Sequence, residues 1–429
     1  MAIQHPVSAT LFAYQVGFGD CFLLRFTYPG NVQKHLLIDF GTTGLPKPVA
    51  KGYMITVAQD IAARCGGKLD AVVATHRHED HVSGFATGGA TSPGQIIRDL
   101  KPEVVIQPWT EKLSLAQNSL GPKGSRGFGA RRAARTLASL QRAAANVVSA
   151  IDAHPKSFSK AGAARMRFIG EDNISNVSAV KNLSTMGKRR VYTYHEGPSG
   201  LEKILPGVKT HVLGPPTLNQ TDTIRKQRKR DPDEFWHLHC KRLADGDTQA
   251  GLSTPVFPHT VAARGTKLPG EARWFANRLR QAREEMMMGI VTALDDQMNN
   301  TSLILLFETK SKKLLFPGDA QIENWAYALS KDKYRKLVAD VDLYKVGHHG
   351  SLNATPRSMW TAFAKRGAAN KPGRLKTVMS TLPGKHGDER SKTEVPRESL
   401  LTAMRSQSDH HSTHTLPQGV LFTEVTIDL

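Results

Sequence analysis

Residues 71–84 read AVVATHRHEDHVSG, so that four apolar residues run directly into a loop rich in histidine and acid. The loop holds four candidate metal ligands within six positions, namely His76, His78, Asp80 and His81. Imidazole and carboxylate are ligands that Zn²⁺ accepts, whereas harder ions such as Mn²⁺ favour a larger carboxylate share. One short loop with this spacing can arrange its side chains around two adjacent ions. The alternative is a set of solvated histidines at a strand end, but the density of ligands favours a metal loop.

Two other acids follow short apolar runs. The runs Leu36–Ile38 and Leu314–Phe316 each lead to an acid beside glycine, which predicts buried strands that present Asp39 and Asp319 at their ends. Asp319 can bridge two metals with its two oxygens. Asp39 either supports the metal loop or is simply a turn acid that caps a strand end.

A histidine pair, His348 and His349, follows the strand-like run at 341–346. We expect one of the two to bind metal and the other to point into the pocket as a proton donor or substrate contact. The sequence does not decide which of the two histidines has which role. Asp80 is a further catalytic candidate, because it could orient the nucleophile as well as bind metal.

Several segments resemble the signatures of a known family in order along the chain. They read QVGFGDCFLL at 15–24, LLIDFG at 36–41, NNTSL at 299–303, LLFPGDA at 314–320 and YKVGHHGS at 344–351. With the histidine loop, they resemble the metallo-β-lactamase-fold hydrolases, and among these the soluble hydrolase domain of competence-related DNA-uptake proteins. The similarity covers residues 10–107 and 297–425, and Phe18 stands where that subgroup usually has glutamine.

The resemblance implies an α/β fold of a particular kind, a four-layered αββα sandwich with two mixed sheets face to face, helices outside and the site at one sheet edge. It implies two divalent metal ions, with zinc favoured over manganese. The implied ligands are His76, His78, Asp80, His81, Asp319 and one of His348 and His349. The implied supports of the metal site are Asp20, Asp39, Asn300 and Ser302.

The chain departs from the wider fold at one ligand. Many members carry a histidine between the first cluster and the bridging aspartate, where this chain has the amide-containing segment 299–302. Because an amide is a weak ligand, we expect one metal to be held less tightly. His211 and His259 are alternatives for the missing ligand, but each is isolated in the sequence and is interpreted as an ordinary surface histidine.

Composition points to the class of partner. The 429 residues carry a formal net charge of +20, which favours polyanions, nucleic acid first and an anionic membrane surface second. The three cysteines, Cys21, Cys65 and Cys240, form no CxxC and are typical of reduced thiols in a cytoplasmic protein. We find no signal-peptide pattern and no apolar stretch long enough to span a membrane. We therefore expect no membrane channel like that of the competence proteins, and the resemblance is not extended to DNA uptake.

The middle of the chain interrupts the rhythm of strands. We expect residues 1–107 and 297–429 to form the hydrolase domain and 108–296 to be a basic, largely helical insertion that elaborates it. Basic clusters lie at 123–142, at 225–230 and in a predicted helix at 271–288. They can contact phosphates or form a solvated basic face. The residues proposed to contact a polyanion are Arg126, Arg131, Arg132, Arg135, Arg225, Lys226, Arg228, Lys229 and Arg230.

Two other histidine-rich runs receive a structural interpretation. Residues 237–240 read HLHC and are interpreted as a packed segment, and residues 409–414 read DHHSTH and are interpreted as a surface loop.

A helix is expected at 56–65. Strands are expected near 9–16, 20–27, 34–39, 69–75, 103–107, 302–308, 312–317, 341–346, 376–380 and 419–427.

The function that these patterns favour is a dinuclear phosphodiesterase or nuclease that acts on nucleic acid through a metal-bound hydroxide. Two adjacent metals, about 3.5–4 Å apart, lower the pKa of a bridging water to near 7. One alternative is a metal-dependent hydrolase of a small ester, cyclic nucleotide or peptide bond, with a protein partner on the basic insertion. The other is a non-catalytic nucleic-acid-binding protein, against which the intact histidine loop argues.

Overall fold

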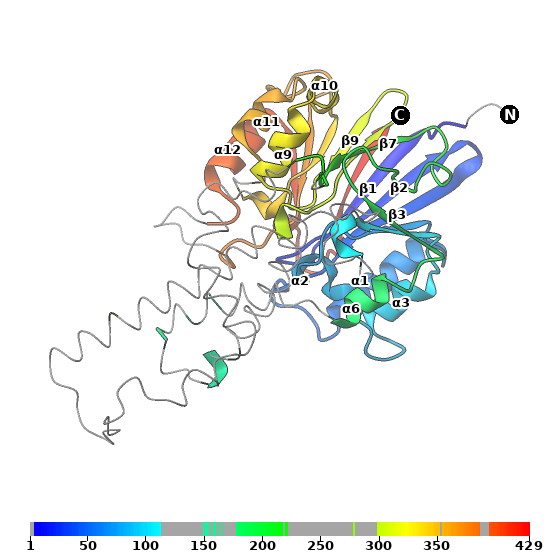
Figure 1. The fold of residues 1–429 in the computed structure, drawn as a ribbon, viewed down its shortest axis with the longest axis vertical. Coiled ribbons are helices and arrows are strands. Elements are labelled where there is room, and N and C mark those ends of the chain that lie inside the picture. Colours follow the sequence, from blue (N-terminus) through cyan, green and yellow to red (C-terminus); the bar gives the residue numbers. More distant parts are fainter. Residues whose placement is uncertain are drawn as a thin grey trace.

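Two mixed β-sheets form the framework of the protein (Figure 1). The structure is a computed structural model, and it describes residues 4–112, 177–217, 219–221, 298–351, 354–386 and 394–429, with isolated residues at 149, 151–153, 158–159, 163, 166 and 278. The α/β class expected from the sequence is therefore confirmed.

The first sheet has seven strands in the order β13-β1-β2-β3-β4-β5-β6. These are β1 (Ser8–Tyr14), β2 (Cys21–Tyr28), β3 (Val32–Phe40), β4 (Ala71–Val73), β5 (Val104–Pro108), β6 (Arg189–Thr193) and β13 (Phe422–Asp428). Neighbours from β13 to β3 pair antiparallel, and those from β3 to β6 pair parallel.

The second sheet has six strands in the order β12-β11-β10-β9-β8-β7. These are β7 (Lys209–Gly214), β8 (Ile304–Glu308), β9 (Lys313–Phe316), β10 (Leu343–Lys345), β11 (Lys376–Met379) and β12 (Asp409–Ser412). Strands β7, β8 and β9 pair antiparallel, and β9 through β12 pair parallel.

Helices gather in two groups, with the strands between them (Figure 1). One group holds α1 (Tyr53–Arg64), α3 (Pro93–Asp99) and α6 (Val177–Leu183), and the other holds α9 (Ile322–Leu329), α10 (Asp332–Ala339), α11 (Arg357–Ala362) and α12 (Glu398–Gln407). In α1, the buried residues Val57, Ala58 and Ile61 follow the spacing of one helical face, which packs on the first sheet. None of the described helices is long and apolar enough to cross a membrane.

The alternation of side chains along the strands builds the cores. Leu36 and Ile38 of β3 belong to a cluster that both sheets share, whereas Leu37 faces the cluster beneath α1, α3 and α6. In the second sheet, Leu305 of β8 joins the shared cluster, and Leu306 faces the cluster beneath the other helices. This period of two is the pattern of strands buried on both faces.

Most expected elements are present with shifted ends, and the expectation for the run at 409–414 is wrong. The run at 409–414, expected to be a surface loop, contains β12, which pairs parallel with β11. Strands β6 and β7 were not expected either. Both lie within the range assigned to the insertion, and each forms an edge of one sheet. The extent of the insertion stays a prediction.

Candidate metal centre

The candidate ligands converge at the carboxyl ends of parallel strands near the middle of each sheet. The histidine loop follows β4, and Asp39 lies near the end of its neighbour β3. Asp319 follows β9, and His349 follows its neighbour β10. Because strands that run parallel end at one edge, residues far apart in the sequence meet there.

Two glycines allow the backbone to approach this closely. A Cβ atom built on Gly41 would lie 2.5 Å from the backbone carbon of Asp80, so no larger residue fits under the short helix α2 (Glu79–Val82). Gly318 has a φ of +54°, and a Cβ there would lie 2.7 Å from the side chain of Thr75. Gly41 therefore lets the end of β3 pack closely against the histidine loop, and Gly318 lets the segment after β9 approach the same loop from the other sheet.

Asp39 holds the histidine loop in place. Its carboxylate accepts hydrogen bonds from the backbone N–H and the hydroxyl of Thr75, both at 2.7 Å. It also lies 2.8 Å from His81 Nδ1. With the proton on Nδ1 facing Asp39, the lone pair of His81 Nε2 is directed into the centre, which is the arrangement of histidine ligands backed by carboxylates.

One group of ligand atoms comes from the histidine loop alone. His76 Nε2 and His78 Nδ1 face each other at 3.0 Å, and both lie within 4.8 Å of an oxygen of Asp80. Burial, with the nearby His81 and His78, lowers the pKa of His76 well below its ordinary value. A neutral imidazole is the form that binds metal.

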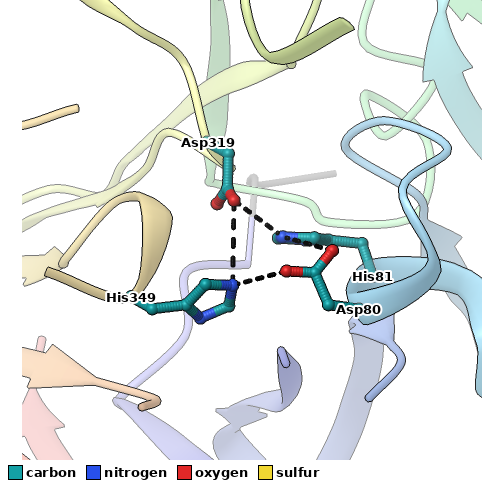
Figure 2. Close-up of side chains that lie close together, drawn as sticks. All are labelled: Asp80, His81, Asp319 and His349. Carbon is teal, nitrogen blue, oxygen red and sulfur yellow. Dashed lines mark hydrogen bonds and ion pairs between the residues drawn. The ribbon is translucent and has the colours of Figure 1, made fainter. Parts of the chain in front are cut away.

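The second group joins the loop to the other sheet, as Figure 2 shows. It consists of Asp80, His81, Asp319 and His349, all buried, with ligand atoms within 4.8 Å of one another. His349 Nε2 lies 2.7 Å from Asp80 Oδ2, and His81 Nε2 lies 3.0 Å from Asp319 Oδ2. Asp80 belongs to both of these groups, so the two candidate sites are adjacent, and a third possible group, Asp20, Asp39 and His81, shares His81 with the second.

Unsatisfied polar atoms test whether a cation fits here. Among the residues that the structure describes, Asp80 Oδ1, His81 Nε2 and Asp319 Oδ2 are buried and make no hydrogen bond. Buried polar atoms are normally paired, and carboxylate and imidazole are suitable donors for a divalent ion. The donor set therefore fits a metal, and these groups could hold one or more ions.

The pKa shifts describe the same excess of negative charge. Burial disfavours the charged form of His81, but Asp319 and Asp80 raise its pKa well above the ordinary value. Burial also disfavours ionisation of Asp80, yet His81 and the hydrogen bond with His349 lower its pKa. The imidazole and the carboxylates thus stabilise each other's charged forms.

The histidine pair divides into a buried and a partly exposed member. His349 is fully buried, and its Nδ1 lies 3.1 Å from the carbonyl oxygen of Ser380, so that Nε2 faces the cluster. The side chain of His348 is 21% exposed, with Nε2 4.0 Å from Asp319 Oδ2. The backbone N–H of His348 donates to Asp319 Oδ1 at 3.0 Å, which leaves Oδ2 as the oxygen that faces the cluster. The geometry favours His349 as the ligand.

The amide segment lies beside the histidine loop but turns toward a helix. The N–H of Leu303 donates to the carbonyl of Thr75 at 2.9 Å. Asn300 Nδ2 donates to Glu323 of α9 at 3.0 Å, and Asn324 Nδ2 donates to the carbonyl of Ser302 at 3.0 Å. The side-chain oxygens of Asn300 and Ser302 are buried without a hydrogen bond in the part of the chain that the structure describes.

Of the two alternative histidines, only His211 lies in the described part of the chain, and it does not fill the missing position. His211 lies in β7, where its Nε2 is 2.7 Å from Glu308, and it is buried rather than at the surface. His259 and the HLHC run at 237–240 lie outside the described residues. So do the residues proposed to contact a polyanion, Arg126, Arg131, Arg132, Arg135, Arg225, Lys226, Arg228, Lys229 and Arg230.

The sequence interpretation missed Lys345 and Ser380. Lys345 is buried beside Asp20 and Asp319, and Ser380 orients His349. A lysine in the otherwise apolar end of β10 was a signal for the first of these, because lysine is almost never buried without a partner. No local pattern marks the carbonyl of Ser380.

No protein-family model matches this chain, and no curated protein matches its sequence. Two mixed sheets with a buried cluster of histidine and aspartate are consistent with the metallo-β-lactamase fold without identifying it.

Proposed function

We propose that the protein is a metal-dependent hydrolase with a dinuclear centre, and that it cleaves phosphodiesters in nucleic acid. In this proposal the two sheets and their helices form a four-layered αββα sandwich of the metallo-β-lactamase type. One ion is held by His76, His78 and Asp80, and the other by Asp80, His81, Asp319 and His349. The main support for the proposal is that Asp80 belongs to both of these buried groups.

Bound divalent ions would supply Lewis-acid activation of water and of a phosphoryl oxygen. The chain supplies orientation and proton transfer. Asp319 presents Oδ2 to the centre because Oδ1 accepts the N–H of His348. His348 is the partly exposed member of the pair, so its Nε2 is placed to give a proton to the leaving oxygen of the substrate.

Charge supports an anionic substrate. Asp20, Asp39, Asp80 and Asp319 carry four negative charges when ionised, and Lys345 carries one positive charge, which leaves three negative charges. Two divalent cations would change this sum to one positive charge. The chain as a whole carries a net charge of +20, which attracts polyanions from solution.

The test is hydrolysis of a panel of substrates by the purified chain, loaded with Zn²⁺ or Mn²⁺. The panel holds single- and double-stranded DNA, RNA, cyclic dinucleotides and casein. We expect nucleic-acid cleavage that a chelator abolishes, and no turnover by the double variant His76→Ala/Asp80→Ala, which should still bind polyanions.

Other outcomes of this panel are equally specific. Cleavage of only cyclic dinucleotides or casein would replace nucleic acid by a small ester or a peptide bond as substrate. Salt-sensitive binding without any turnover would favour a non-catalytic nucleic-acid-binding protein. Full activity in the double variant would contradict the proposed centre.

A further inference from the structure

Lys345 at the end of β10 is a buried cation that the catalytic scheme does not use. Its side chain is 3% exposed and forms an ion pair with Asp20. Its ammonium also lies 3.3 Å from the carbonyl of Gly318 and 3.6 Å from Asp319 Oδ1. An ammonium paired with a buried carboxylate in this way keeps its ordinary positive charge.

The partner of Lys345 stands directly behind two metal-binding histidines. Asp20 is fully buried, with Oδ1 3.5 Å from His349 Nδ1 and Oδ2 3.6 Å from His81 Nδ1. Within the described residues, Lys345 is therefore almost completely shielded from solvent. It lies one layer back, against the carboxylates that surround the centre.

The charges explain why a cation is needed at this point. The four buried aspartates carry four negative charges when all are ionised, and Lys345 reduces the sum for these five residues to three. Uncompensated buried charge strongly opposes folding. A fixed ammonium is present from the moment the chain folds, whereas a metal has to be captured.

We propose that Lys345 is a positioning residue whose ammonium serves as a resident cation, which keeps the centre folded before metal binds and at the same time weakens metal binding. This inference rests on the proposed metal centre. The loss of Lys345 changes charge more than geometry, because the N–H of His348 still holds Asp319 Oδ1.

The test compares Lys345→Met with the wild type by thermal unfolding, with and without Zn²⁺, and by competition with a chromophoric chelator. We expect the metal-free variant to unfold at a lower temperature and the Zn²⁺-induced rise in Tm to be larger than in the wild type. Zn²⁺ should bind more tightly by on the order of tenfold, within the usual range for coupling between two bound groups.

Lys34→Met is the matched control. Lys34 pairs with the buried Asp70 at 2.8 Å, on the first sheet and outside the groups that could hold metal. The same substitution there should lower Tm equally with and without Zn²⁺. An equal loss in both conditions for Lys345→Met would overturn the inference.

The double variant Lys345→Met/Asp20→Asn keeps the test decisive if Lys345→Met fails to fold. It removes one charge of each sign, so the sum of three negative charges is restored, and its response to Zn²⁺ should return to that of the wild type. A double variant that stays unfolded with Zn²⁺, or that responds like Lys345→Met, would contradict the role of charge.

If the wild type itself binds no metal, the proposed function fails, and that result is distinct from a failure at Lys345.

Discussion

At the scale of single residues, the partner of Nδ1 in each of two imidazoles determines the direction in which Nε2 points. His81 turns Nδ1 to Asp39, and His349 turns Nδ1 to the carbonyl of Ser380. In both cases Nε2 is directed to the cluster in Figure 2. Outer partners of this kind keep a ligand oriented, and their loss typically weakens metal binding about 10–100-fold.

The histidine pair gives a prediction with two separable effects. His349→Ala should lower the metal content of the purified protein, because His349 Nε2 lies within the buried group. His348→Ala should leave metal content unchanged and cut turnover by about 10²–10⁴-fold, the usual contribution of a general acid. Elemental analysis and steady-state kinetics measure the two effects. If neither change alters metal content or rate, the site has been placed wrongly.

At the scale of elements, the sequence was most informative where an apolar run ends in an acid. Asp39 and Asp319 could be predicted as strand-end acids because local pattern marks both the strand and its end. Lys345 and Ser380 act through partners on other strands, so their roles appear only when the two sheets are in place. Strands β6 and β7 were missed because they are edge strands within the range assigned to the basic insertion.

Strand β12 shows why a histidine-rich run was mistaken for a surface loop. Polar composition favoured solvent, but the parallel pairing with β11 brings His410 against Thr377, with Nδ1 and Oγ1 2.9 Å apart. Burial, with the charge of Arg405, lowers the pKa of His410 to about 4. Tertiary pairing has overridden local composition.

This shift predicts a loss of stability in acid. The pKa of His410 is lower in the folded chain than in the unfolded chain, about 6.5 there, so protons favour the unfolded state. The contribution is present above pH 6.5 and is lost as the pH falls toward 4. His410→Gln should make the decline of Tm across this window shallower, whereas the exposed His5→Gln should not. An identical decline in all three proteins would refute the assignment.

At the scale of the whole molecule, a negative centre lies within a strongly positive chain. The buried aspartates attract cations, and the net charge of +20 attracts polyanions. The basic clusters that would carry the second effect lie outside the described residues. Their role is therefore a prediction from sequence, and salt dependence tests it.

Nucleic-acid affinity should fall steeply with salt, because the release of counterions drives such binding. One variant neutralises the second basic cluster, with glutamine at Arg225, Lys226, Arg228, Lys229 and Arg230. The slope of log affinity against log salt should shrink by roughly 0.7–0.9 for each phosphate that the variant no longer neutralises. Turnover of a short diester should survive, since it is too small to reach this cluster. An unchanged slope here, and in a variant neutralised at Arg126, Arg131, Arg132 and Arg135, would indicate a solvated basic face.

The central claim is that two buried groups of histidine and aspartate hold two metal ions. Elemental analysis of the purified protein tests it most directly, after exchange into metal-free buffer. We predict close to two ions of zinc or manganese per chain, and a loss of both in the double variant His76→Ala/Asp80→Ala, because Asp80 belongs to both groups. A wild type that holds no metal after reconstitution with Zn²⁺ or Mn²⁺, or a double variant that holds as much metal as the wild type, would contradict it.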